Sequence, residues 1–141
     1  SILDDFGVKY TKNVMSAHRT PHDVMELIKT SEEHGCKVFI AAAGMAAHLA
    51  GAVAAHSTKP VIGIPIESGG MGGIDSLLST AMMPPGVPVA TVAVGKSGAK
   101  NSAILAVQIL ATSDEDLAQK LVEYKQNMRS EVLEKDKKLN S

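Results

Sequence analysis

The sequence has few aromatic side chains and no excess of charge of either sign. Phe, Tyr and Trp make up 3% of its 141 residues, and the formal net charge is −1. Because no basic field is present to attract phosphate backbones, a nucleic-acid partner is not expected. Ala and Gly dominate residues 41–55, and such small residues let a ligand or another chain approach the backbone closely. A core this poor in large side chains predicts further burial between subunits, and so a homo-oligomer.

Cysteine and long apolar runs are also scarce. Cys36 is the only cysteine, which excludes an intramolecular disulfide and a thiolate metal cluster and predicts a reducing, cytoplasmic compartment. No run of about 18 apolar residues is present, so we expect neither a membrane-spanning helix nor a membrane partner. The first residues, SILDDFGVKY, lack the basic start and apolar stretch of a signal peptide.

Apolar runs alternate with helical patterns along the chain. Continuous apolar runs of this kind indicate strands that are buried on both faces of a parallel sheet. With right-handed crossovers, the order predicts a doubly wound, three-layer α/β/α sandwich. The pattern predicts strands at 12–17, 37–43, 61–66 and 89–94, and helices at 21–34, 46–57, 74–83, 98–112 and 114–138.

We expect a single domain over residues 1–141. Thr20 with Asp23, and Ser113 with Asp116, have the spacing of capping boxes that open helices. The first residues resemble the end of a helix, so the pattern begins without the strand that normally starts a doubly wound domain. A preceding strand and its loop are therefore expected to be missing from this sequence.

Each predicted strand is followed by a loop that is a candidate for binding. In open parallel sheets, ligands bind outside the carboxyl ends of the strands, so we expect these loops to share one edge. Most of them are rich in Gly, Ala or Ser, as expected where backbone lies close to a small molecule. The loops are 16–20, 42–48, 66–73 and 94–101.

His18 and Arg19 stand side by side between the first predicted strand and the helix that starts at Pro21. Imidazole takes up and returns a proton near neutral pH, and a guanidinium suits phosphate or carboxylate. Ser16 adds a hydroxyl, and the following helix adds free N–H groups for an anion. The alternative is that His18 only caps the turn and Arg19 is a solvated surface charge.

The other histidines divide into one candidate and three surface residues. His48 begins a helix whose positive end favours a neutral ring, which would hydrogen-bond a substrate or shape its pocket. A packed core histidine is the alternative. We expect His22, His34 and His56 at the surface. Because the histidines have no metal-ligand spacing with carboxylates or thiolates, no metal site is expected.

The glycine-rich loop 69–73 is expected to be a mobile lid, with an ordinary flexible connection as the alternative. Asp75 follows it as a first-turn charge that complements the helix dipole. Met82 and Met83 are expected to be packing residues. No G-x-S-x-G turn is present and Cys36 precedes an apolar strand, so a nucleophilic triad is not expected.

Several segments together resemble the PurE family of purine biosynthesis, in order and over nearly the whole chain. The most specific signal is SAHRTP with AAHL downstream. The resemblance implies a flavodoxin-like three-layer fold and a homo-octamer. The matching segments are SAHRTP (16–21), AGMAAHLAG (43–51), PVIGIPIES (60–68), GGIDSLLSTAMMPPGVPVATVAVG (72–95) and AKNSAILAVQIL (99–110).

The resemblance also implies an activity that needs no cofactor. The AAHL stretch and the segment from IDSLLS to MPPGVPVAT resemble class I, whose bacterial members convert N5-carboxyaminoimidazole ribonucleotide (N5-CAIR) to 4-carboxy-5-aminoimidazole ribonucleotide (CAIR). Two alternatives stay open: the class II carboxylase, which uses CO2 directly, and an inactive nucleotide-binding module. The implied site comprises His18 as the catalytic residue, Ser16 and Arg19 as contacts to substrate phosphate and ribose, and Ala43, Gly44 and His48 around the carboxylate.

The chain also departs from the family pattern. Met45 stands where a second glycine is common, and Ala50 stands where proline is usual. The loop SGGMGG is more glycine-rich than is typical of the family. The family's G-S-x-S-D phosphate loop is expected to precede Ser1.

Overall fold

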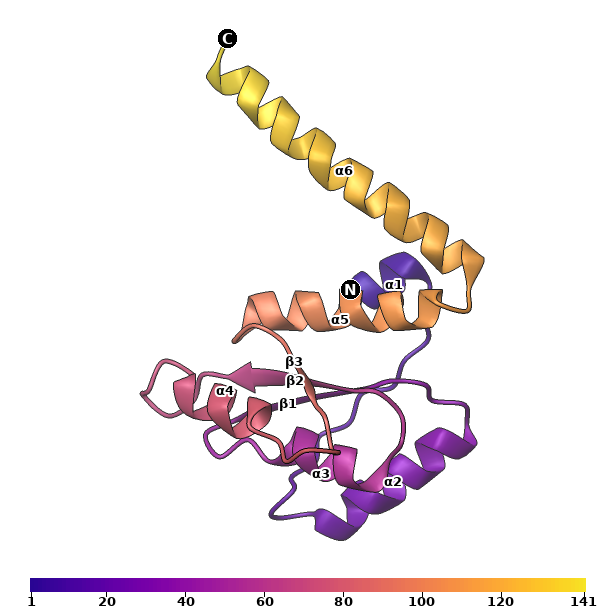
Figure 1. Cartoon of the computed structure of the whole chain (residues 1–141), viewed down its shortest axis with the longest axis vertical. Coiled ribbons are helices and arrows are strands. Elements are labelled where there is room, and N and C mark those ends of the chain that lie inside the picture. The colour runs from indigo at the N-terminus through magenta and orange to yellow at the C-terminus, as the bar shows by residue number, and fades with distance from the viewer.

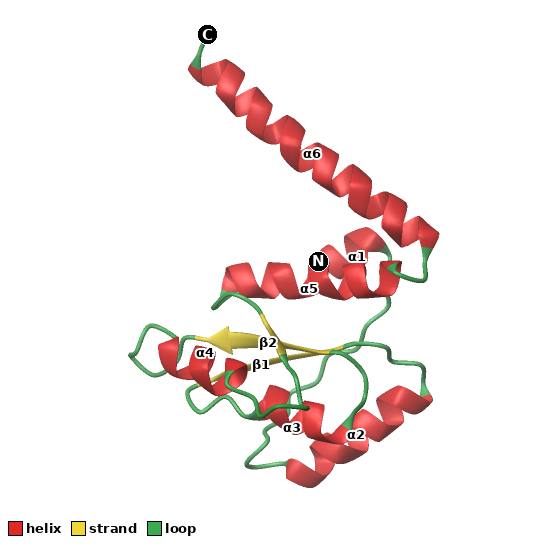
Figure 2. Cartoon of the chain, viewed as in Figure 1, coloured by secondary structure: helices red, strands yellow, loops and turns green.

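The computed structural model describes all 141 residues (Figures 1 and 2). Helices and strands alternate from α2 to α5, as predicted. The strands are β1 (Phe39–Gly44), β2 (Val61–Ile66) and β3 (Ala90–Thr91). The helices are α1 (Ile2–Phe6), α2 (Pro21–Glu33), α3 (Leu49–His56), α4 (Ile74–Ala81), α5 (Lys96–Ala111) and α6 (Glu115–Leu139).

The central sheet is parallel, with the strand order β1-β2-β3. β1 and β2 pair from Phe39 with Val61 to Gly44 with Ile66. Helices α1 and α5 lie on one side of the sheet, and α2, α3 and α4 lie on the other (Figure 1). The predicted three-layer α/β fold with a parallel sheet is therefore confirmed.

One cluster of buried side chains joins α2 and α3 to the sheet. α2 places Val24 and Ile28 on its inner face, one helical turn apart, as its apolar periodicity requires. Small residues let α3 approach the strands closely, because Ala50 is 2% exposed and lies over Gly63 of β2. The cluster comprises Val24, Ile28, Ala41, Ala50, Val53 and Val61.

Residues 12–17, predicted as a strand, are not part of the sheet. A strand needs a neighbour to satisfy its backbone N–H and C=O groups. β1 pairs only with β2, so no ladder of hydrogen bonds reaches this segment. Val14 is 100% exposed, which shows that nothing packs over the side chain that would have anchored the strand. The segment instead leads irregularly into the turn before α2.

The prediction that strand 37–43 is buried on both faces was also wrong. β1 has Ala41 buried but Ile40 and Ala42 exposed, and Ile40 is 38% exposed. Successive side chains of a strand point to opposite faces, and α5 packs chiefly over β2. One face of β1 is therefore uncovered, whereas β2 is buried from Val61 to Pro65 as predicted.

The fourth predicted strand, 89–94, shortens to the two residues of β3. β3 lies at the edge of the sheet and pairs with Ile62 and Gly63 of β2. Beyond it, the Val92 N–H donates to the Gly63 carbonyl at 3.1 Å, and the Gly95 N–H donates to the Pro65 carbonyl at 2.9 Å. The chain thus follows β2 beyond the ladder itself.

Neither predicted capping box forms. The Thr20 hydroxyl bonds backward to the backbone of Ser16 and makes no capping bond to α2. At α6 the N-cap is Asp114, whose Oδ1 accepts a hydrogen bond from the Leu117 N–H at 3.0 Å. The hydroxyl of Ser113, the predicted cap, instead faces the Leu110 carbonyl.

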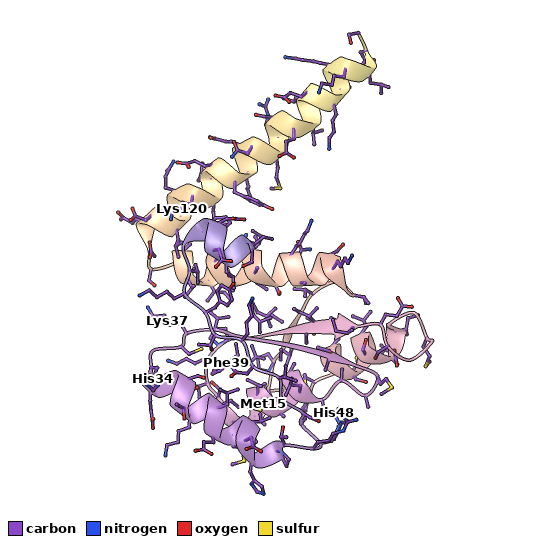
Figure 3. All side chains as sticks on the ribbon, turned by 180° about the vertical axis from the view of Figure 1, so that it is seen from behind. Met15, His34, Lys37, Phe39, His48 and Lys120 are labelled. Atoms are coloured by element: carbon purple, nitrogen blue, oxygen red, sulfur yellow. The ribbon has the colours of Figure 1, made fainter.

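Helix α6 extends away from the rest of the chain and has no buried residue (Figure 1). Its first half packs against α5 and also touches α1, where the rings of Phe6 and Tyr124 have centroids 5.7 Å apart. Lys120, at the base of α6, donates from Nζ to the Phe6 carbonyl at 3.0 Å (Figure 3). None of the helices combines the length and the hydrophobicity needed to cross a bilayer.

Candidate functional site

A closed turn before α2 presents His18 at the surface. The Thr20 N–H donates to the Ser16 carbonyl at 2.9 Å, and the Ser16 N–H donates to the Thr20 hydroxyl at 2.9 Å. The Arg19 N–H donates to the Ser16 hydroxyl at 3.2 Å. These bonds hold the two ends of the turn together, so the exposed His18 and Arg19 lie at its apex.

A second turn, between β1 and α3, presents His48. Met45 takes a left-handed conformation with φ 51°, and its carbonyl accepts from the Ala47 N–H at 2.9 Å. The His48 N–H donates to the Ala46 carbonyl at 2.8 Å. The chain therefore reverses after Gly44, and α3 begins at Leu49 with His48 as its N-cap, three residues later than predicted.

The two turns bring His18 and His48 together. His18 Nε2 and His48 Nδ1 are 2.8 Å apart, and the rings meet edge to face with centroids 4.9 Å apart. Both side chains are exposed, and His48 lies at the surface on the turn that leads from β1 to α3 (Figure 3). Neither histidine is a packed core residue, so that alternative is excluded for His48.

The histidine pair lines a hollow of about 360 Å³ at the sheet edge. α3 contributes only small side chains to it, which leaves the ring edges accessible from the hollow. Its lining residues are Ala17, His18, His48, Gly51, Ala52, Ser79 and Met83. Two predicted site residues, His18 and His48, are in the lining; Ser16, Arg19, Ala43 and Gly44 are not.

Two lining residues, Ser79 and Met83, were not assigned to a site from the sequence. Ser79 lies on α4, and its hydroxyl donates to the Asp75 carbonyl at 2.7 Å. Met83, predicted to pack, does contact α3, because its sulfur lies 3.3 Å from where a Cβ on Gly51 would be. No pattern in the sequence pointed to Ser79, because α4 reaches the hollow only through tertiary packing.

The predicted site residues Ala43 and Gly44 end β1 beside the glycine-rich loop. Gly44 pairs with Ile66 in the sheet, and Ala43 pairs with Pro65. A Cβ on Gly44 would overlap the Ser68 hydroxyl and lie 2.9 Å from the Ser68 Cβ. The end of β1 and the loop after β2 are thus in direct contact, as expected if the loops that follow the strands share one edge of the sheet.

The glycine-rich loop reaches α4 through several left-handed residues. Gly70, Gly72 and Gly73 have φ of 74°, 63° and 83°, a region that side chains rarely adopt. Met71, at the tip, is 61% exposed. Beneath the loop, Asp75 Oδ1 is buried without a hydrogen-bond partner.

The side chains that commonly bind metal ions, those of His, Cys, Asp and Glu, do not form groups of three or more anywhere in the chain.

Comparison with known proteins identifies the family. A family model described as AIR carboxylase matches residues 1–131. The chain belongs to the AIR carboxylase family. A crystal structure of PurE from Treponema denticola matches with a TM-score of 0.86 at 28% identity, covering 99% of this chain and 86% of that one. The predicted resemblance to the PurE family, with its flavodoxin-like fold, is therefore confirmed.

Similar family members carry one activity name. N5-carboxyaminoimidazole ribonucleotide mutase of Bacillus subtilis is 54% identical over 138 residues, which are 98% of this chain and 85% of that protein. The protein of the same name from Methanocaldococcus jannaschii is 49% identical over 139 residues, 99% of this chain and 85% of that protein. The similarity thus extends across bacterial and archaeal relatives.

Proposed function

We infer that this chain is an N5-carboxyaminoimidazole ribonucleotide mutase, an isomerase that converts N5-CAIR to CAIR in purine biosynthesis. The observation that carries the inference is 54% identity over 98% of the chain to a mutase of that name. The hollow beside His18 and His48 supplies a site for the reaction at the edge where parallel sheets bind ligands. The substrate is a small phosphorylated heterocycle.

His18 is the proton shuttle of the proposed reaction. As the N–CO2 bond of the carbamate breaks, imidazolium at His18 protonates the nitrogen, giving aminoimidazole ribonucleotide and CO2. Carbon 4 of the heterocycle then attacks CO2, and neutral His18 removes the proton from carbon 4. The enzyme ends in its starting protonation state, and these steps require no cofactor. The exposed ring at the apex of its turn supports this role, since it is free to meet a substrate.

The residues around His18 hold the substrate. Arg19 is exposed on the same turn and forms no salt bridge, so its guanidinium is free to bind phosphate. The Ser16 hydroxyl accepts from the Arg19 N–H, which leaves its own hydrogen available to the ribose or phosphate. Ala43, Gly44 and His48 enclose the carboxylate end.

The hollow keeps CO2 beside its acceptor. Holding both fragments in one place makes recombination effectively unimolecular, and excluding water prevents loss of the intermediate. The glycine-rich loop 69–73 acts as the lid. Its left-handed glycines and exposed Met71 support this role, because backbone without side chains moves with few packing contacts to break.

The enzyme works as a cytoplasmic homo-octamer. The single cysteine supports a reducing compartment. The uncovered face of β1 and the projecting helix α6 support the assembly. Tyr124, Met128 and Val132 follow one another at helical spacing, and Met128 and Val132 are 42% and 64% exposed. Such a row is stabilised when another subunit covers it.

The double variant Met128→Glu/Val132→Glu is expected to reduce the oligomer to smaller species. Two carboxylates in a desolvated contact between subunits lose their hydration without gaining partners. Size-exclusion chromatography with light scattering measures the mass, and Ser130→Glu on the opposite face of α6 is the matched control. A monomeric wild type, or a double variant of unchanged mass, would contradict the assembly proposed here.

The function itself is tested with purified protein and synthetic N5-CAIR in buffer without bicarbonate. A mutase forms CAIR under these conditions. A class II carboxylase does not use N5-CAIR and forms CAIR only from aminoimidazole ribonucleotide and CO2. An inactive binding module forms no CAIR from either substrate.

A further inference from the structure

We propose that His48 is a positioning residue that fixes the tautomer and orientation of His18, an inference that rests on the proposed mutase function. The observation is the 2.8 Å contact between His18 Nε2 and His48 Nδ1. Because this contact occupies Nε2, the other ring nitrogen of His18, Nδ1, is the one that exchanges a proton with the substrate.

The direction of the hydrogen bond follows from the chemistry of the shuttle. When His18 is an imidazolium, both of its ring nitrogens carry hydrogen and neither accepts. The contact with His48 then survives only if His18 Nε2–H donates and His48 Nδ1 accepts. His48 must therefore be the tautomer with hydrogen on Nε2. If this arrangement persists in the neutral state, His18 keeps its Nε2 hydrogen throughout and cycles only at Nδ1.

The position of His48 in the fold leaves its Nδ1 free for this task. His34 and His56 lie at the ends of helices, and their Nδ1 atoms bond the backbone carbonyls of Thr30 and Ala52 at 2.7 and 2.8 Å. His48 is instead the N-cap of α3, so no preceding turn of its own helix offers such a carbonyl. The side chain of His48 forms no hydrogen bond other than the one to His18.

The surroundings of the pair provide no competing partner. Ser79, the polar side chain in the lining besides the two histidines, bonds the Asp75 carbonyl of its own helix at 2.7 Å. Ala17, Gly51 and Ala52 have no polar side-chain atoms. His18 thus depends on His48 for its side-chain hydrogen bond, as a metal-bound histidine depends on the outer partner that fixes its tautomer.

Two substitutions at His48 separate this role from substrate contact. His48→Asn replaces Nδ1 with an amide oxygen at a similar place that accepts from His18 Nε2–H, and His48→Leu leaves no acceptor. Both remove Nε2, so any loss of substrate contact is shared and raises KM in both. We expect His48→Leu to lower kcat about 10- to 100-fold, the cost typical of losing an outer partner, and His48→Asn to recover most of that loss.

A spectroscopic measurement tests the inference without relying on activity. In protein labelled with 15N-histidine, the nitrogen shifts of His18 should report hydrogen on Nε2 in the wild type and in His48→Asn, and a mixture of tautomers in His48→Leu. His22→Leu, on the outer face of α2, is the control: it removes the signals of His22 itself but should change neither the His18 shifts nor kcat. Equal kcat values for His48→Asn and His48→Leu, or unchanged His18 shifts in His48→Leu, would overturn the proposal. A wild type with the expected shifts but no mutase activity would refute the proposed function alone.

Discussion

His18→Asn is expected to lower kcat for the conversion of N5-CAIR to CAIR by about 10²- to 10⁴-fold, the usual contribution of general acid–base catalysis. Asparagine keeps a polar group of similar reach at the apex of the turn but neither takes up nor releases a proton near neutral pH. Carbamate cleavage and proton removal from carbon 4 both lose their proton carrier. The loss should therefore appear in kcat, measured by CAIR formation with saturating substrate.

Substrate binding distinguishes a catalytic role for His18 from a structural one. Isothermal titration with CAIR should give a dissociation constant for His18→Asn within a few-fold of the wild-type value, because Arg19 and the Ser16 hydroxyl stay in place. His22→Asn changes a histidine outside the hollow and is the matched control for activity. Binding lost together with turnover would contradict the proton-shuttle role, and so would a variant with full activity.

Gly44→Ala is expected to lower kcat/KM by about 10²-fold, because small misplacements of catalytic groups carry costs of that order. The added methyl would overlap the Ser68 hydroxyl and lie 2.9 Å from the Ser68 Cβ and 3.2 Å from the Ile66 carbonyl. The turn that carries His48 must then move away from the glycine-rich loop. The assay of CAIR formation measures the loss, and circular dichroism verifies that the sheet remains folded.

Removing the opposing side chain should restore the activity of Gly44→Ala. Ser68→Gly deletes both the hydroxyl and the Cβ that the new methyl would meet, so the double variant should recover at least part of the lost kcat/KM. Ser68→Gly alone is the control and should stay near the wild-type value, since the Ser68 side chain forms no hydrogen bond and does not line the hollow. A double variant as impaired as Gly44→Ala would show that the contact with Ser68 is not the cause.

The order of elements was predictable because it depends on local patterns. The apolar run 61–66 indicated a buried strand, and β2 is buried as expected. Burial of β1 was not predictable in the same way, because it depends on which helix packs over each face. Residues 12–17 likewise have the composition of a strand, but pairing requires a neighbour that the chain does not bring there.

The sequence allowed individual site residues to be predicted, but the way in which they contact one another was harder to predict. The chemistry of His18 and His48 and their places after strands were visible in the sequence. Their contact at 2.8 Å joins residues 30 positions apart and depends on the left-handed Met45, a conformation that side-chain patterns do not indicate. Ser79 and Met83 were less visible, because α4 and the residues that follow it reach the hollow only through tertiary packing.

Isotopic labelling of the carboxylate tests the mutase assignment most directly. Purified wild-type protein is given N5-CAIR in buffer that contains 13C-bicarbonate, and the CAIR formed is analysed by mass spectrometry. A mutase that keeps CO2 in its pocket predicts rapid formation of CAIR with an unlabelled carboxylate, at a rate that does not depend on bicarbonate. CAIR that carries the label, or CAIR formed only when aminoimidazole ribonucleotide and bicarbonate are supplied, would contradict it.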